Sequence, residues 1–183
     1  MPRAFRLSAA LALGAAAVLA GPASAQLNPS AQQPETSLRG PDSLMDGAAH
    51  DRHSQLAAFG VYAWTLGYGI AGRFALPILK DGLLPELNES IELELGGDFI
   101  ISTLGISFSV LAATAEPRWT FHFTPQLDGY FKLGVGVFIL APPGIGLVAP
   151  LAAVGGQYRL GPNLVIRAEA GNFGLALGAG LEF

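Results

Sequence analysis

The last stretch of the chain, "NFGLALGAGLEF" (172–183), alternates between two kinds of residue. From Phe173 onward every second residue is apolar, and the residues between are mostly glycine and alanine. A period of two is the side-chain pattern of a β-strand, in which neighbouring residues point to opposite faces. One apolar face, one nearly empty face and a terminal Phe183 are not typical of a strand in a water-soluble sheet.

The same period recurs along the chain from residue 55. Apolar residues alternate with small or charged ones in "WTFHF" (119–123), "GYFKLGVGVFI" (129–139) and "NLVIRAEAG" (163–171). Turn signals rich in Gly, Pro, Asn and Asp separate the runs, and the stretch 141–150 is predicted to be a longer loop. The pattern predicts eight strands, over approximately 55–65, 67–77, 90–101, 113–124, 128–140, 150–160, 163–171 and 173–183.

The stretch 133–156 contains no charged residue and is long enough to cross a bilayer as a helix. Pro142, Pro143 and Pro150 lie inside it, and a proline in a helix removes a hydrogen bond and clashes with the preceding turn. Two strands joined by a loop therefore explain this stretch better, with a single helix as the alternative.

The predicted strands have the length of tilted transmembrane strands, which is about 9–11 residues. A sheet inside a membrane must close, because an open edge would leave backbone groups unpaired in hydrocarbon. The predicted fold class is therefore all-β, an antiparallel up-and-down transmembrane β-barrel of about eight strands. With Val135 facing lipid and Gly134 facing inward, we expect Val135→Arg to be disruptive and Gly134→Ser to be mild.

The inward-facing set contains five basic and five acidic residues, together with His122. The interior of an eight-stranded barrel is only wide enough for side chains, and buried charges are costly unless they are paired. Equal numbers of the two signs predict a paired network that plugs the lumen, rather than a channel. The predicted network comprises Arg73, Glu92, Glu94, Asp98, Arg118, His122, Lys132, Arg159, Arg167, Glu169 and Glu182.

Residues 1–25 have the pattern of a secretory signal peptide: a basic start, an apolar run and an Ala-Ser-Ala site that predicts cleavage after Ala25. The alternative is an N-terminal membrane anchor, for which the apolar run is short. Residues 26–54 are rich in Gln, Ser, Pro and Asp and predict a flexible polar leader before a barrel domain over 55–183. The "HDRH" segment (50–53) is better explained as part of this solvated leader than as a metal site.

Composition excludes several classes of function. Without Arg3 and Arg6, the chain after residue 25 has 8 basic and 14 acidic residues, a net charge of −6, which argues against nucleic acid as a partner. The absence of Cys excludes disulfides and thiolate metal sites. "GYGIAG" (67–72) matches a dinucleotide-binding pattern, but no helix pattern follows it, so we predict no cofactor.

These features resemble the small outer-membrane β-barrel proteins of Gram-negative bacteria. The resemblance rests on the signal peptide ending "GPASA", the alternating strands, the hairpin "YRLGPNLVIRAEAG" (158–171) and the closing "GLEF". In that family the last strand ends in an aromatic residue that the barrel-assembly machinery reads, so the resemblance implies that Phe183 is an assembly signal. It also implies a location in the outer membrane, a monomer, and contact with outer-membrane lipid, the assembly machinery and periplasmic chaperones.

The function expected from these features is that of a non-enzymatic outer-membrane barrel, structural or presenting loops at the surface. One alternative is a conduit or binder of small molecules at the barrel mouth, using the apolar loop over 141–150. A remote alternative is a lipid-modifying enzyme, because lipid A deacylases use a His and a nearby Ser, whereas this barrel offers only His122 and Thr124. A soluble barrel of lipocalin type would need a polar outer face.

Overall fold

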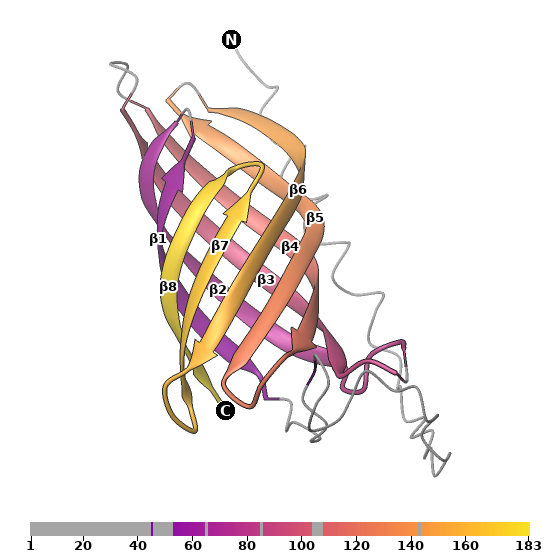
Figure 1. The fold of residues 1–183 in the computed structure, drawn as a ribbon. Coiled ribbons are helices and arrows are strands. Elements are labelled where there is room, and N and C mark those ends of the chain that lie inside the picture. The colour runs from indigo at the N-terminus through magenta and orange to yellow at the C-terminus, as the bar shows by residue number, and fades with distance from the viewer. Residues whose placement is uncertain (1–44, 46–52, 65, 85, 104–107, 143) are drawn as a thin grey trace. The chain divides into compact units, whose positions relative to one another are not determined.

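The computed structural model describes Met45 and residues 53–64, 66–84, 86–103, 108–142 and 144–183. Within these residues the chain forms eight β-strands that close into one barrel (Figure 1). The strands are β1 (Gln55–Ala63), β2 (Gly67–Leu79), β3 (Glu89–Ser102), β4 (Ser109–His122), β5 (Leu127–Ala141), β6 (Ile145–Arg159), β7 (Leu164–Gly171) and β8 (Gly174–Glu182).

The order of strands around the barrel is their order in the chain. Each strand pairs antiparallel with the next, and β1 pairs antiparallel with β8 to close the sheet. Beyond this seam, Ser54 and Phe183 exchange backbone hydrogen bonds of 3.1 and 3.0 Å. The predicted fold, an antiparallel up-and-down barrel of eight strands, is confirmed.

Two predicted strand starts are wrong. β4 begins at Ser109 rather than at 113, and β6 begins at Ile145 rather than at 150. The predicted loop over 141–150 is thus a short connection, 142–144, followed by a strand that contains Pro150. Pro150 pairs with β5, but β7 pairs with β6 only from Ala153 onward, so the missing N–H of the proline costs no strand-to-strand bond on that side.

β5 and β6 occupy the uncharged stretch 133–156, so the helical alternative for this stretch is wrong. In the described residues, no helix is both long enough and apolar enough to cross a membrane.

The two ends of the barrel differ. We call the end that carries Phe183 and the connections 80–88, 123–126 and 160–163 the proximal end, and the opposite end the distal end (Figure 1). The distal connections are short, since they span only residues 64–66, 103–108, 142–144 and 172–173.

The wall of the barrel has unequal height. Strands β3 to β6 contain 14 or 15 residues each, whereas β7 and β8 contain 8 and 9. The last β6–β7 pair is Ala153–Gly171, and β6 continues from there to Ile145, so the β5–β6 hairpin rises beyond the β7–β8 turn (Figure 1). We call the missing part of the wall above Asn172 and Phe173 the notch.

The interior has two layers. The middle and proximal part of the lumen holds buried charged and polar side chains. The distal part holds an apolar cluster formed by Ala63, Ile100, Val110, Phe138 and Leu151. Outward-facing positions carry large apolar side chains along every strand, as the exposure of Ile70, Leu95, Leu111, Val135, Val154, Ile166 and Leu177 illustrates.

Part of the predicted domain organisation falls outside the description. The signal peptide 1–25, with its predicted cleavage site at Ala25, lies outside the described residues. Of the predicted leader 26–54, only Met45, His53 and Ser54 are described, and Met45 is buried. The signal peptide and the leader therefore stay predictions.

Candidate functional site

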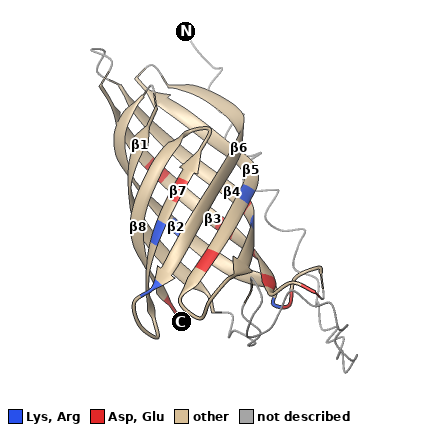
Figure 2. Cartoon of the chain, viewed as in Figure 1, with Lys and Arg blue, Asp and Glu red and all other residues tan. Residues whose placement is uncertain are grey.

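Strand alternation brings the charged side chains of the barrel into one lumen. In the described residues, ion pairs join five basic side chains to seven acidic ones inside it. The charged residues of the strands lie in the middle and proximal part of the barrel (Figure 2). The basic members are Arg73, Arg118, Lys132, Arg159 and Arg167, and the acidic members are Glu92, Glu94, Asp98, Glu116, Asp128, Glu169 and Glu182.

Glu94 of β3 lies at the centre of this network. Its Oε2 accepts a hydrogen bond of 2.7 Å from Arg167 Nη2 and one of 3.1 Å from Arg118 Nη1. Its Oε1 accepts one of 2.8 Å from Lys132 Nζ. Three cations from three other strands thus meet one fully buried carboxylate, which satisfies the condition under which buried charges are tolerated.

A second acidic position, Glu169 of β7, shares two of these cations. Lys132 Nζ lies 2.8 Å from Glu169 Oε2, and Arg167 Nη2 lies 2.6 Å from Glu169 Oε1. Tyr130 donates its hydroxyl to the same carboxylate at 2.9 Å. Glu116 is held less closely, since its nearest cation in the described residues is Lys132 Nζ at 3.6 Å.

The proximal part of the lumen is also paired. Arg118 Nε donates to Glu92 Oε2 at 3.2 Å, and Thr120 donates to the same oxygen at 2.7 Å. Arg159 reaches both Asp128, at 2.8 Å, and Glu182, at 3.2 Å. At the distal edge of the network Arg73 pairs with Asp98 at 2.7 Å, and its Nε lies 4.0 Å from Glu94 Oε1.

Gln55 of β1 connects strands from opposite sides of the barrel. Its Oε1 accepts from Arg167 Nη1 at 2.8 Å and from Arg118 Nη1 at 3.1 Å. Its Nε2 donates to Glu182 and to Gln157, both at 3.3 Å. An uncharged side chain on the first strand therefore completes a network whose charges come from the other strands.

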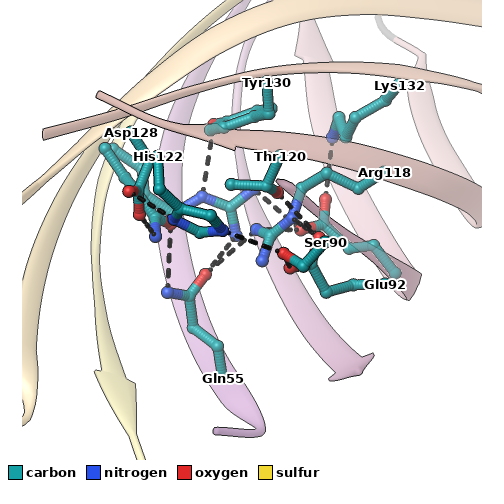
Figure 3. A network of polar contacts seen from close by, with 12 residues as sticks. Gln55, Ser90, Glu92, Arg118, Thr120, His122, Asp128, Tyr130 and Lys132 are labelled. Atoms are coloured by element: carbon teal, nitrogen blue, oxygen red, sulfur yellow. Dashed lines mark hydrogen bonds and ion pairs between the residues drawn. The ribbon is translucent and has the colours of Figure 1, made fainter. Parts of the chain in front are cut away.

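Ser90, His122 and Asp128 form a hydrogen-bonded row (Figure 3). Ser90 Oγ lies 3.1 Å from His122 Nε2, and His122 Nδ1 lies 2.7 Å from Asp128 Oδ1. These are the distances of a Ser-His-Asp catalytic triad. Ser90 is fully buried, however, and donates its hydroxyl to Glu92 at 2.6 Å.

The cavity next to His122 is too small for an acyl substrate. The cavity that His122 and Glu92 line has a volume of about 20 Å³, which suits a single water molecule. Thr124, the other residue weighed for acyl chemistry, instead accepts backbone N–H bonds from Gln126 and Leu127 at 3.2 and 2.9 Å in its turn. The row therefore has the distances of a triad without room for its reaction.

The structure brings all eleven predicted network residues into the lumen, each within bonding distance of a partner. The expected equality of charge is wrong, because Glu116 and Asp128 face inward as well. Glu116 lies two residues from Arg118, and Asp128 lies four residues from Lys132. Residues at even spacing on a strand point to the same face, so the alternation could have predicted both. The network also has uncharged members, which a prediction based on charged residues could not include. They are Gln55, Ser90, Thr120, Tyr130 and Gln157.

A cavity separates the charged layer from the apolar cluster. Its volume is about 70 Å³, which accommodates several water molecules. Arg73 and Thr114 lie at its charged side, and Phe138 and Leu151 lie at its apolar side. Arg73 Nε and Thr114 Oγ1 have no hydrogen-bond partner among the described residues. No group of three or more His, Asp or Glu side chains in the described part of the chain is arranged to hold a metal ion.

The chain has the architecture of a small eight-stranded β-barrel. No family model and no curated protein matches it. Similar solved structures include Ail, the attachment invasion locus protein of Yersinia pestis, at 12% identity and a TM-score of 0.49, covering 73% of this chain and 100% of that one. A de novo designed transmembrane β-barrel is similar at 17% identity and a TM-score of 0.47, covering 72% and 95%.

Neisserial surface protein A is also similar, at 12% identity and a TM-score of 0.43, covering 72% of this chain and 95% of that chain. Likenesses of this degree assign no function to the chain.

Proposed function

We propose that this chain is a non-enzymatic, structural barrel of the bacterial outer membrane whose lumen is sealed by paired charges. The observation that carries the proposal is the inversion of the two faces. Charged side chains are buried inside, whereas large apolar side chains such as Ile70 and Val148 are exposed outside, at 67% and 70%. Such an outer surface is unfavourable in water and favourable in lipid, by about 25 cal/mol per Å² of apolar area.

Aromatic side chains near both ends of the barrel support a membrane location. Near the distal end, Tyr62 packs on Trp64 and on Tyr68, with ring centroids 6.0 and 5.2 Å apart. On the proximal part of the wall, Trp119 packs on Phe121 and on Phe131, with centroids 5.6 and 5.5 Å apart. Two aromatic belts on either side of an apolar band are typical of outer-membrane barrels.

The pairing of the lumen charges supports a sealed interior. An ion that crosses the barrel would have to displace side chains held by Glu94 and Glu169 from several strands. The interior of an eight-stranded barrel is just wide enough for side chains to fill, which leaves no open channel beside them. The short distal connections, at most the six residues of 103–108, favour a structural role over the presentation of loops at the surface.

The proposal includes the route to the membrane. A cleaved signal peptide ending at Ala25 would export the chain, and periplasmic chaperones would deliver it to the barrel-assembly machinery, with Phe183 as the signal. Phe183 is 63% exposed and its ring packs on Phe74, at 6.4 Å between centroids, so its side chain is accessible for recognition. We propose that the assembled barrel is a monomer in contact with outer-membrane lipid.

Conductance in planar lipid bilayers tests the sealed lumen against the alternative of a conduit. We expect the purified, folded wild-type barrel to give no steady current. A variant with Glu94→Ala, Lys132→Ala and Arg167→Ala together removes the centre of the network and provides the matched positive control. Steady conductance of the wild-type monomer at the level of this variant would contradict the proposal and favour the conduit.

The cavity between the charged layer and the apolar cluster is the observation that favours a small-molecule binder as the second candidate. Its volume of about 70 Å³ is far below the roughly 300–1,000 Å³ of most ligand pockets. We therefore place a binder of drug-sized molecules second.

A further inference from the structure

The distal end of the barrel carries no charge among the described residues. The stretches 55–72, 99–115, 133–158 and 170–181 contain no Asp, Glu, Lys or Arg, and they include all four distal connections. A barrel mouth that opens into water normally carries polar side chains. Here the lumen at this end is filled by the apolar cluster around Ile100, Phe138 and Leu151.

The distal part of the β5–β6 hairpin is apolar on its inner face as well as on its outer face. Ile145 and Leu147 lie on the same inward face of β6 as the buried Leu151, yet they are 57% and 44% exposed. They are exposed because β7 and β8 end lower and leave no opposing wall beside them. We call this inner surface the trough; it comprises Phe138, Leu140, Ile145, Leu147 and Leu151.

Several backbone groups at the base of the notch are hydrogen-bonded within the protein. Asn172 donates its backbone N–H to Ala152 O at 3.0 Å, and its side-chain Oδ1 accepts from Ala152 N at 3.1 Å. Asn172 Nδ2 donates to Pro150 O at 3.0 Å, and Pro150 has no N–H to satisfy. On the other side, Trp64 Nε1 donates to Gly171 O at 2.9 Å. Backbone groups next to hydrocarbon are costly unless they are satisfied within the protein, and those of Pro150, Ala152, Gly171 and Asn172 named here are satisfied.

The wall at the notch is lower than a bilayer. Strands β7 and β8, of 8 and 9 residues, tilted as barrel strands are, span about 20 Å along the barrel axis. The apolar band of an outer-membrane barrel is about 25 Å tall. Lipid chains beside β7 and β8 therefore face the trough above the turn rather than a wall.

From these observations we infer that the notch admits the hydrocarbon chain of one membrane lipid, which lies against the trough. The inference rests on the proposed membrane location. Phe138 and Phe173, stacked with centroids 4.5 Å apart, form the floor on which the chain rests, and the charged layer remains below them. A second copy of this protein is a poorer occupant, because Pro150 and the bonds of Asn172 leave only the short stretch 145–149 of the β6 edge for a pairing strand.

Contact quenching by brominated lipids tests the inference. The reporter is a single tryptophan at Phe138→Trp, in a full mature chain that also carries Trp64→His, which keeps a ring N–H to donate to Gly171 O, and Trp119→Phe. The barrel is folded into nanodiscs that hold one copy each, with either normal or brominated acyl chains. We expect the buried, inward-facing reporter to lose more than half of its emission in brominated lipid. Phe173→Trp in the same background is a second reporter, should the first variant not fold.

Two control positions separate the possible failures. Tyr68→Trp, which is 62% exposed on the outer face, must be strongly quenched in any barrel that lies in lipid. If it is not quenched, the membrane location fails and the inference fails with it. Tyr130→Trp, buried in the charged layer, should keep its emission. If Tyr68→Trp is quenched while Phe138→Trp and Phe173→Trp are quenched no more than Tyr130→Trp, the barrel is embedded but the notch is closed to lipid, and the inference is wrong.

Discussion

Arg167 Nη2 donates a hydrogen bond of 2.7 Å to Glu94 Oε2 in the centre of the lumen, although the two residues lie 73 positions apart in the chain. Neither side chain has access to solvent. Because Glu94 also holds Arg118 and Lys132, one carboxylate balances cations from β4, β5 and β7. Removing its charge affects all three at once.

Glu94→Gln should destabilise the barrel by about 3–5 kcal/mol, the usual cost of breaking a buried ion pair by the loss of one partner. Unfolding by urea in lipid vesicles, followed by the gel shift between folded and boiled protein, measures this loss. Glu86→Gln, in the exposed β2–β3 connection, is the matched control and should leave the midpoint unchanged. Equal midpoints for Glu94→Gln and the wild type would show that the network does not stabilise the fold.

Ser90→Ala and Thr114→Val should have different effects, although both remove a buried hydroxyl. Ser90 Oγ bonds Glu92 and contacts His122, so its loss should cost about 1–3 kcal/mol. Thr114 Oγ1 has no partner among the described residues, so Thr114→Val should be neutral or slightly stabilising. The same urea titration compares the two, and a larger loss for Thr114→Val would mean that an ordered water holds its hydroxyl.

The burial of Ser90 also predicts chemical inertness. A serine-directed fluorophosphonate should not label the folded wild-type barrel, because Ser90 is fully buried and the cavity that His122 lines is only about 20 Å³. Labelling that disappears in Ser90→Ala but persists in Ser109→Ala would instead identify a working nucleophile.

Val135→Arg should cost about 2–4 kcal/mol, because it places a charge on the lipid-facing side near the middle of the barrel. The expectation that Gly134→Ser is mild is wrong. A Cβ at Gly134 would collide with the carbonyl oxygen of Ala115 and would lie 2.8 Å from the Cα of Glu116. Gly134→Ser should therefore also destabilise, for reasons of backbone packing rather than of polarity.

Ala75→Ser is a better inward control for Val135→Arg. Its cross-strand neighbours are Gln55 and Glu94, so an added hydroxyl meets polar groups. We expect a change below about 1 kcal/mol in the free energy of unfolding. A larger loss for Ala75→Ser than for Val135→Arg would contradict the assignment of the two faces.

The alternation of side chains was enough to predict the strands and their closure, because a period of two persists wherever the two faces differ. It failed at residues 145–149, where both faces of β6 are apolar and Pro142, Pro143 and Pro150 together predicted a loop. The partners of Glu94 were beyond prediction as well. They depend on the register of four strands, which is fixed only when the barrel closes.

Phe183→Ser should reduce the amount of folded protein in the outer membrane without lowering the stability of the barrels that do form. The substitution keeps the backbone bonds to Ser54 and removes a mostly exposed ring. Quantitative immunoblots of outer-membrane fractions, together with urea unfolding of the purified protein, separate assembly from stability. Tyr68→Ser, which removes an exposed aromatic at the distal end, should assemble normally. Normal levels of Phe183→Ser would remove the case for an assembly signal.

The hydrogen bonds of Gln55 form only when the barrel is complete. It lies on the first strand and accepts from guanidinium groups on β4 and β7, so those donors are fully engaged only after the first and last strands have met. A half-built sheet that carried Arg118 and Arg167 into hydrocarbon would expose N–H donors that lack the Gln55 acceptor. Entry of single hairpins into the bilayer, one after another, would therefore be heavily penalised. In the membrane location that we propose, the sheet must close into a barrel before, or while, its outer surface meets lipid.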